Sequence, residues 1–194
     1  MLDEVYSEDW VGRQLEGETF TEVVFVEADL AEVVTSATTF DTCTFKGVRF
    51  NGSQHKASAF VNCTFQRSTF FDATFVGCKL VGSTFEKCSF DLLKVEGGDW
   101  SFVSLASADL RSARFDGARF READLAHVKA AGATLTDLDL SGALLLGADL
   151  TGADLRGSDL SALDPTETRV VDAIVSLDQA VNVARGLGFD VRSD

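Results

Sequence analysis

The hydrophobic residues of this chain follow a five-residue rhythm. From Phe20 to Leu160, every fifth position is large and apolar at nearly every step: 13 of these 29 central positions are Phe and 11 are Leu. A period of five matches neither the 3.6-residue repeat of a helix nor the two-residue alternation of a flat strand. Each five-residue unit must therefore contain its own turn.

A second slot lies two places before each central residue, and small side chains fill it. All four cysteines of the chain fall in this slot, at Cys43, Cys63, Cys78 and Cys88. Eleven of the 16 glycines lie two places after the central residue, where a turn can use their freedom at positive φ. The repeated unit is therefore a small residue, then Asp, Thr or Arg, then Phe or Leu, then any residue, then Gly.

This unit is similar to the A(D/N)LXX signature of the pentapeptide-repeat family, and it continues over 145 residues without a phase slip. The resemblance implies an all-β fold, a right-handed quadrilateral β-helix with four units per coil, whose central and small residues point inward. Twenty residues then form one coil, and about seven coils stacked ~4.8 Å apart form a rod.

Both ends depart from the rhythm, so we expect three regions. Residues 1–19 keep their large residues in phase but lose the small slot, whereas Asp164 and Pro165 break the rhythm itself. The capping box from Ser176 to Gln179 predicts a short C-terminal helix from Leu177 to Arg185. The expected regions are an irregular N-terminal coil over 1–19, a pentapeptide-repeat β-helix over 20–163, and a C-terminal cap and dimerisation module over 164–194.

The C-terminal region carries more apolar side chains than a short cap needs. When this many apolar side chains are left exposed, they usually mark an interface. We therefore expect a two-fold homodimer formed through residues 170–190. Its candidate interface residues are Ile174, Val175, Val181, Ala184, Leu187 and Phe189.

The chain is strongly acidic, with a formal net charge of −14. Such a field repels phosphate backbones, which argues against direct nucleic-acid binding. The charge is uneven: residues 1–41 carry a net −10, residues 42–94 a net +4, residues 95–132 a net −1 and residues 133–194 a net −7. Acidic ends therefore flank a basic middle.

The slot just before the central residue holds repeated aspartates in the C-terminal half. With twenty residues per coil, Asp139 lies directly below Asp159, and Asp109 lies two coils below Asp149. Two interpretations remain open, because aspartate here can cap backbone groups of the turn or form columns of carboxylates on the scale of DNA phosphates. The residues concerned are Asp99, Asp109, Asp124, Asp139, Asp149, Asp154 and Asp159.

Two segments, 53–65 and 175–181, resemble the fluoroquinolone-resistance branch of the family. The resemblance implies an acidic, rod-like dimer, joined through its C-terminal ends, that mimics duplex DNA and binds DNA gyrase. From their spacing and charge, we expect the seven aspartates to form the gyrase-binding surface. Plasmid-borne members of that branch interrupt their coils with loops, and the unbroken phase here leaves no room for them. The alternative is a generic acidic interaction scaffold with another partner, such as a regulatory GTPase.

Enzyme chemistry is not expected, because a filled β-helix offers no cleft in which catalytic side chains converge. His55 occupies a central slot and is expected to be a hydrogen-bonded core residue, and the sequence holds no nucleotide-binding motif or metal-ligand cluster. We expect no cofactor and no metal. Cys43 and Cys63 occupy equivalent slots of adjacent coils, where a disulfide is geometrically allowed, but a reducing cytoplasm favours free thiols.

The sequence also predicts where the protein acts. The N-terminus has no basic start, and no run of eighteen apolar residues occurs along the chain. A secretory signal and a membrane-spanning helix would each need such a feature. We therefore expect a soluble cytoplasmic protein that does not interact with a membrane.

Overall fold

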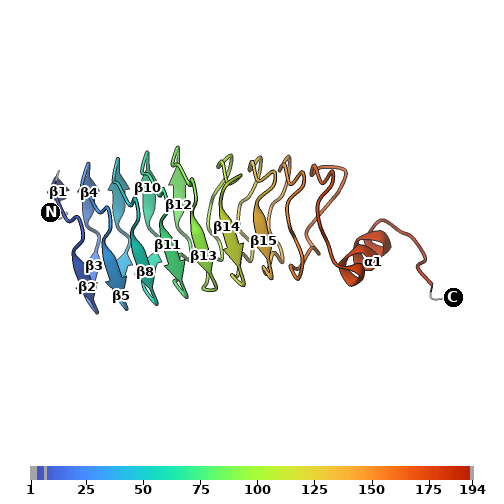
Figure 1. Ribbon diagram of the computed structural model, residues 1–194, viewed down its shortest axis with the longest axis horizontal. Helices are drawn as coiled ribbons and strands as arrows, with labels where there is room; N and C mark the ends of the chain where they lie inside the picture. The colour runs from blue at the N-terminus through green and yellow to red at the C-terminus, as the bar shows by residue number, and fades with distance from the viewer. Residues whose placement is uncertain (1–3, 7, 193–194) are drawn as a thin grey trace.

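The computed structural model describes residues 4–6 and 8–192, and these form one elongated rod (Figure 1). Short three-residue strands stack side by side along it, and the helix α1 (Leu177–Gly186) lies at the C-terminal end. Every strand pairing is parallel and joins residues twenty positions apart, such as Phe25 with Phe45 and Phe45 with Phe65. The predicted four units per coil are therefore confirmed.

The rod has four sides, which we number in chain order. The first side is the sheet of β1 (Glu4–Tyr6), β4 (Val24–Val26), β7 (Thr44–Lys46), β10 (Thr64–Gln66) and β12 (Thr84–Glu86). The third side is the sheet of β2 (Gln14–Glu16), β5 (Val34–Ser36), β8 (Gln54–Lys56), β11 (Thr74–Val76), β13 (Lys94–Glu96), β14 (Arg114–Asp116) and β15 (Thr134–Thr136). Six full turns of the chain therefore separate β2 from β15.

The other two sides are built largely from single parallel bridges. The second side links Asp9, Asp29, Arg49, Thr69 and Ser89 in sequence, and further along the rod Asp109, Lys129, Asp149 and Arg169. The fourth side starts as the sheet of β3 (Thr19–Thr21), β6 (Thr39–Asp41) and β9 (Ala59–Val61) and continues by bridges through Lys79, Asp99, Arg119, Asp139 and Asp159. Outward residues on one side therefore form columns with a twenty-residue step.

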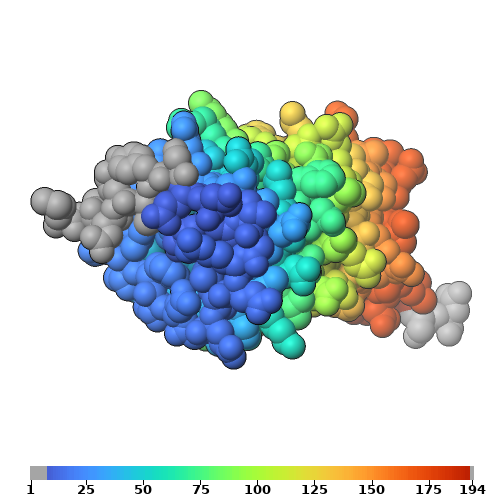
Figure 2. All heavy atoms as spheres, turned by 60° about the vertical axis from the view of Figure 1, so that its left-hand side comes forward, coloured from blue at the N-terminus to red at the C-terminus, as the bar shows by residue number. Residues whose placement is uncertain are grey.

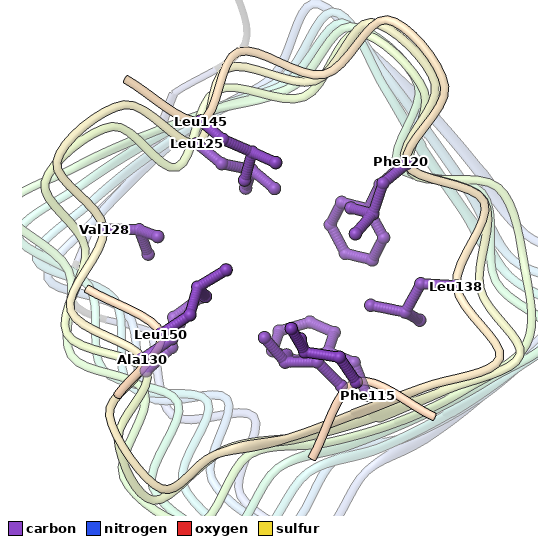
Figure 3. Close-up of a pocket in the computed structure, with 12 residues that line it drawn as sticks. Phe115, Phe120, Leu125, Val128, Ala130, Leu138, Leu145 and Leu150 are labelled. Atoms are coloured by element: carbon purple, nitrogen blue, oxygen red, sulfur yellow. The ribbon is translucent and has the colours of Figure 1, made fainter. Parts of the chain in front are cut away.

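The core is the column of central side chains inside the rod. All of the 29 predicted central residues except the half-buried Phe20 are buried, and those of successive coils converge from the four sides (Figure 3). The rings of Phe25, Phe45, Phe65 and Phe85 stack with centroids 4.9, 4.8 and 4.6 Å apart. This spacing equals that of adjacent strands, about 4.8 Å. Aromatic rings can therefore stack in successive coils without altering the spacing of the backbone.

Leucines replace most rings in the C-terminal half, and the filling there is less complete. Ala130 occupies a central slot between Leu110 and Leu150 of the neighbouring coils, and it is fully buried. An apolar cavity of about 30 Å³ lies among the surrounding leucines and phenylalanines (Figure 3). Its lining offers water no polar partner, so the cavity is expected to be dry.

Hydroxyl and thiol groups in the small slot connect one coil to the next. The Ser68 hydroxyl donates to the carbonyl of Phe45 and accepts from the backbone N–H of Val48, both at 3.2 Å. The Ser68 hydroxyl therefore links the Phe45 C=O to the Val48 N–H, two groups that a closed β-turn joins by a direct hydrogen bond. Ser83 makes the same bridge three corners further along the chain, to the Phe60 carbonyl and the Cys63 N–H.

The cysteines use this slot in a similar way. The thiol of Cys63 donates to the Phe40 carbonyl at 3.3 Å, and that of Cys78 donates to the His55 carbonyl at 3.3 Å. All four cysteines are free thiols. Burial raises the pKa of Cys78 and of Cys88 to about 11, so both remain protonated donors at neutral pH. Cys43 and Cys63 therefore act as small core donors, and no disulfide joins them.

His55 is the centre of a buried polar cluster, as its slot predicts. Its Nδ1 lies 2.9 Å from the Thr35 hydroxyl and its Nε2 lies 3.0 Å from the Ser53 hydroxyl, and the Thr35 hydroxyl lies 2.8 Å from that of Ser58. The ring also contacts Phe75, with centroids 4.5 Å apart. Burial lowers the pKa of His55 to about 3, so the imidazole is neutral at physiological pH.

Helix α1 closes the C-terminal end as the capping box predicts. Ser176 accepts from the backbone N–H of Gln179, and the Gln179 side chain accepts in return from the Ser176 N–H at 2.7 Å. The Gln179 amide also donates to the carbonyls of Leu155 and Ser158, each at 2.7 Å. One side chain therefore caps the helix and fastens it to the last coil. No helix in the described part of the chain is long and apolar enough to cross a membrane.

The His55 cluster predicts a loss of stability in mild acid. The unfolded-state pKa of 6.5 lies above the folded value, so stability is complete above about pH 6.5 and falls as the pH drops towards 3. We expect a loss of about 2 kcal/mol in unfolding free energy between pH 7 and pH 5 from this group, measured by urea unfolding. In His55→Phe the unfolding free energy should change less steeply with pH than in the wild type. In His127→Gln, the control at an exposed site, the pH dependence should equal that of the wild type. An equal slope in His55→Phe would contradict this account.

Two neighbouring glycines give a second prediction. A Cβ at Gly98 (φ +92°) would come 2.9 Å from the Cys78 nitrogen and closer still to the Cys78 carbonyl oxygen, whereas a Cβ at Gly97 (φ +62°) would meet no atom within 4 Å. Gly98→Ala should lower the unfolding free energy by about 3 kcal/mol or more, because the backbone of Cys78 must move. Gly97→Ala should lower it by only about 1 kcal/mol, the strain of an alanine at positive φ. Thermal melts of the two variants check this, and similar losses would show that the clash is relieved cheaply.

Candidate functional site: outward aspartates and the C-terminal end

The structure distributes the seven predicted aspartates over all four sides of the rod. Their positions follow from the register of the bridges. Asp124 lies on the first side, Asp109 and Asp149 on the second, Asp154 on the third, and Asp99, Asp139 and Asp159 on the fourth. They therefore surround the rod instead of forming one patch.

Each of the seven carboxylates braces its own turn. Its Oδ1 accepts a hydrogen bond from the backbone N–H two residues later: the Thr151 N–H donates to Asp149 at 3.1 Å, and the Ser161 N–H donates to Asp159 at 2.9 Å. The same bond forms at Asp99, Asp109, Asp124, Asp139 and Asp154. This is the local Asx geometry that favours aspartate before a turn, and it holds the carboxylates in fixed directions.

Four of the seven carboxylates are also paired with arginines. Arg111 contacts Asp109 at 2.6 Å, Arg156 contacts Asp154 at 2.7 Å, Arg119 contacts Asp99 at 3.3 Å, and Arg121 contacts Asp139. The Arg111 guanidinium holds the pKa of Asp109 below its ordinary value, and Arg156 does the same for Asp154. Most basic residues near these aspartates thus neutralise them locally.

The columns of carboxylates are shorter than the aspartate spacing alone suggests. Asp139 and Asp159 are direct neighbours on the fourth side, as expected, but Arg119 separates Asp139 from Asp99. On the second side, Lys129 lies between Asp109 and Asp149. The unbroken acidic character is therefore limited to the last coils.

Three predicted aspartates form no ion pair within the described residues: Asp124, Asp149 and Asp159. Hydrogen bonds from the Thr151 side chain and backbone lower the pKa of Asp149, so it stays charged well below neutral pH. Two further exposed acids, Glu122 and Asp137, stand at corners with φ of 52° and 53°. The sequence pattern did not indicate these two acids, because they lie two places after the central residue, where the repeated unit usually has glycine.

The C-terminal end has an incompletely covered apolar mouth. An apolar cavity of about 280 Å³ lies between the last central residues, such as Leu160 and Val170, and residues of the cap, such as Val183 and Phe189. Beside it, a larger hollow of about 700 Å³ separates the segment 158–166 from α1. A single helix therefore does not complete the end of the rod.

The predicted interface residues divide between this mouth and the solvent. Val175, Val181 and Ala184 are half-buried, whereas Ile174, Leu187 and Phe189 are exposed, Phe189 to 65%. Leu177, which the sequence analysis treated only as the first helical residue, is 80% exposed. An apolar residue directly after the N-cap is the signal that could have added Leu177 to the predicted interface.

The described residues contain no group of three or more His, Cys, Asp or Glu side chains placed to hold a metal ion. The interior of the rod is filled mainly with apolar side chains, apart from the hydrogen-bonded His55 cluster and the buried serines, and its charged groups lie on the outer sides. Such an arrangement is suited to recognition by surface contact.

Comparison with known proteins agrees with the geometry. The family model "Pentapeptide repeats" matches eight copies within residues 95–126, 104–137 and 123–161. The chain is 36% identical over 110 residues to the pentapeptide repeat protein MfpA of Mycobacterium tuberculosis, an alignment that covers 57% of each protein. It is 38% identical over 60 residues to MfpA of Mycolicibacterium smegmatis, covering 31% of this chain and 29% of that protein.

Solved structures support the fold in the same way. Two trypsin-treated variants of QnrB1, a plasmid-mediated fluoroquinolone resistance protein, align over all of this chain with TM-scores of 0.50 and 0.53. Those alignments cover 100% and 99% of the QnrB1 chains, at 21% and 22% identity. The fold is thus a four-sided β-solenoid. Residues 95–161 match the pentapeptide-repeat model, and the chain is similar to MfpA.

Proposed function

We propose that this protein binds DNA gyrase as a mimic of duplex DNA and thereby confers fluoroquinolone resistance. The proposal rests on the resemblance of segments 53–65 and 175–181 to that branch of the family, and on the similarity to MfpA. The observation that carries it is the set of turn-braced carboxylates around the last coils. Their directions are fixed before binding, which lowers the ordering cost of association.

Charge complementarity supports this choice of partner. A protein surface that binds DNA presents Lys and Arg at the spacing of phosphates, and residues 133–194 offer a net −7. The aspartates Asp124, Asp149 and Asp159 supply charge that is not held in a close ion pair within the described residues. Gyrase that is occupied by the mimic forms fewer complexes with DNA, and such complexes are the targets of the drug. The protein would act on gyrase in the cytoplasm.

We further propose that two copies associate through their C-terminal ends. Leu187 and Phe189 line the uncovered mouth, and Ile174 and Leu177 are exposed in the same C-terminal region. A two-fold contact would bury these apolar side chains on both copies at once. The acidic last coils of the two rods would then meet at the centre of the dimer. This would double the length of acidic surface offered to gyrase.

The dimer predicts a change in sedimentation. Leu177→Asp with Phe189→Asp places two carboxylates in the proposed interface while leaving the monomer intact, because both side chains are exposed. We expect the wild type to sediment as a dimer at micromolar concentration and the double variant as a monomer. Val11→Asp, at a 46% exposed valine of the opposite end, is the matched control. A monomeric wild type would refute the contact.

The acidic surface predicts a difference between two triple variants. Asp124→Asn, Asp149→Asn and Asp159→Asn remove unpaired charges, whereas Asp99→Asn, Asp109→Asn and Asp154→Asn remove charges that arginines already neutralise. Asn retains the side-chain oxygen that accepts the turn N–H, so both variants should stay folded. We expect the first to lose about tenfold in gyrase inhibition, or ~1.4 kcal/mol, and the second about twofold. Both losses should shrink at high salt.

The measurement is inhibition of gyrase supercoiling with and without a fluoroquinolone, accompanied by a thermal melt of each variant. Equal potency of the wild type and the first triple variant, both folded, would remove the acidic surface from the mechanism. A wild type without any effect on gyrase would favour the alternative, a scaffold with a different partner such as a regulatory GTPase.

A further inference from the structure

The second side of the rod carries an unusual surface in its basic middle, between Lys46 and Leu92. Its floor is small and flat, since Thr69 and Ser89 are half-buried neighbours in the bridge column. One long edge of this floor is basic and the other is apolar. We call it the middle surface, formed by Lys46, Arg67, Thr69, Phe71, Lys87, Ser89 and Leu92. It includes neither the seven aspartates nor the C-terminal end.

The apolar edge consists of Phe71 and Leu92. Phe71 is 51% exposed and Leu92 is 47% exposed. Leu92 stands at a corner where every other coil carries a polar residue or glycine. Leu92 also has φ 59°, a left-handed conformation that disfavours a bulky side chain. Left-handed φ values recur at many corners of the rod, including 59° at Phe102, so the feature that marks Leu92 is its exposed apolar side chain.

The basic edge consists of Lys46, Arg67 and Lys87. Arg67 and Lys87 occupy the same corner of successive coils, with φ 51° and 55°, so their side chains leave the rod about one strand spacing apart, ~4.8 Å. Neighbouring bases are already used, because Arg49 pairs with Asp29 and Lys94 pairs with Asp72. Among the described residues, Lys46, Arg67 and Lys87 form no ion pair.

Nearby acids do not cancel this edge. Glu86 accepts a hydrogen bond from the Gln66 amide at 3.0 Å on the first side. Asp72, which pairs with Lys94, and Asp91, in register with Phe71, lie across the floor on the edge of Phe71 and Leu92. Residues 42–94 as a whole carry a net +4 within a chain of −14. The middle surface is therefore the place where this acidic protein attracts negative charge.

We propose that the middle surface binds an acidic amphipathic segment of a second protein. Such a segment would place its carboxylates against Arg67 and Lys87 and its apolar side chains against Phe71 and Leu92, across the flat floor between them. An apolar centre beside charged groups is the usual anatomy of a protein contact.

Two other occupants fit less well. The acidic N-terminal coils of a second copy offer few apolar side chains for Phe71 and Leu92, since Val11 and Val34 are the large exposed ones within residues 8–41. A nucleic acid would meet the repulsion of the net −14 charge along the rest of the rod. The favoured occupant is therefore a separate, acidic protein segment.

The test uses a defined probe, a fluorescein-labelled 16-residue helical peptide with Glu along one face and Leu along the next. Its partner peptide has Gln in place of every Glu. We expect the Glu peptide to bind the full-length protein in a fluorescence anisotropy titration, and the Gln peptide to bind at least about tenfold more weakly. Binding should weaken as salt rises from 50 to 300 mM.

Paired variants locate the binding site. Arg67→Glu with Lys87→Glu, and separately Phe71→Ser with Leu92→Gly, should each weaken binding about tenfold. The matched control is Lys79→Glu with Phe102→Gly, which alters an exposed base and an exposed aromatic at φ 59° on the fourth side. It should leave binding unchanged. Leu92→Gly relieves backbone strain, so its thermal midpoint should not fall and weaker binding cannot be ascribed to unfolding.

Several results would overturn the proposal. These are no binding of the Glu peptide at millimolar concentration, equal binding of the Gln peptide, or an equal loss in the control variant. Self-association of the wild type that disappears in the Arg67→Glu, Lys87→Glu variant would assign the surface to a second copy. Displacement of the peptide by a 20-base-pair duplex would assign it to nucleic acid. Gyrase inhibition should be the same in all these variants, which separates this proposal from the preceding one.

Discussion

The twenty-residue register of the parallel backbone ladder is the constraint on which the rest of this structure depends. Because each coil pairs with the next at the same residue of every unit, any side chain is repeated about one strand spacing further along the rod, ~4.8 Å. Flat rings tolerate such repetition, and Phe25, Phe45 and Phe65 stack face to face. The skewed choice of phenylalanine among apolar residues thus follows from the ladder.

The same register governs the outer surface, with the opposite consequence. Identical charges stacked at this spacing repel one another, whereas alternating charges attract. The fourth side accordingly runs Lys79, Asp99, Arg119 and Asp139 before two aspartates become neighbours at Asp159. On the fourth side acidic character is therefore strongest where the alternation stops, near the C-terminal end, and on the second side Asp9 and Asp29 stack at the other end. Basic character remains where Arg67 and Lys87 are neighbours in register.

The sequence was sufficient for everything that depends on phase. The central positions, the unbroken solenoid and the helix after Ser176 could be predicted because each is encoded by spacing or by a local capping box. Contacts between coils could not. The pairing of Arg121 with Asp139 depends on the direction of a long side chain across the bridge, and the bridge of Ser68 to Phe45 and Val48 depends on which turns are closed. The exposure of Leu177 depends on how α1 crosses the last coil.

The change of filling along the core makes the rod mechanically uneven. Stacked rings fill the coils from Phe20 to Phe90, whereas leucines and the small Ala130 fill the coils beyond Phe120, around a cavity. A coil in a solenoid is held only by its two neighbours, so a pulling force on the ends is resisted locally and not by the whole core. Under tension the leucine-filled segment would yield first, and it would unravel towards Trp100 while the aromatic segment still held its shape.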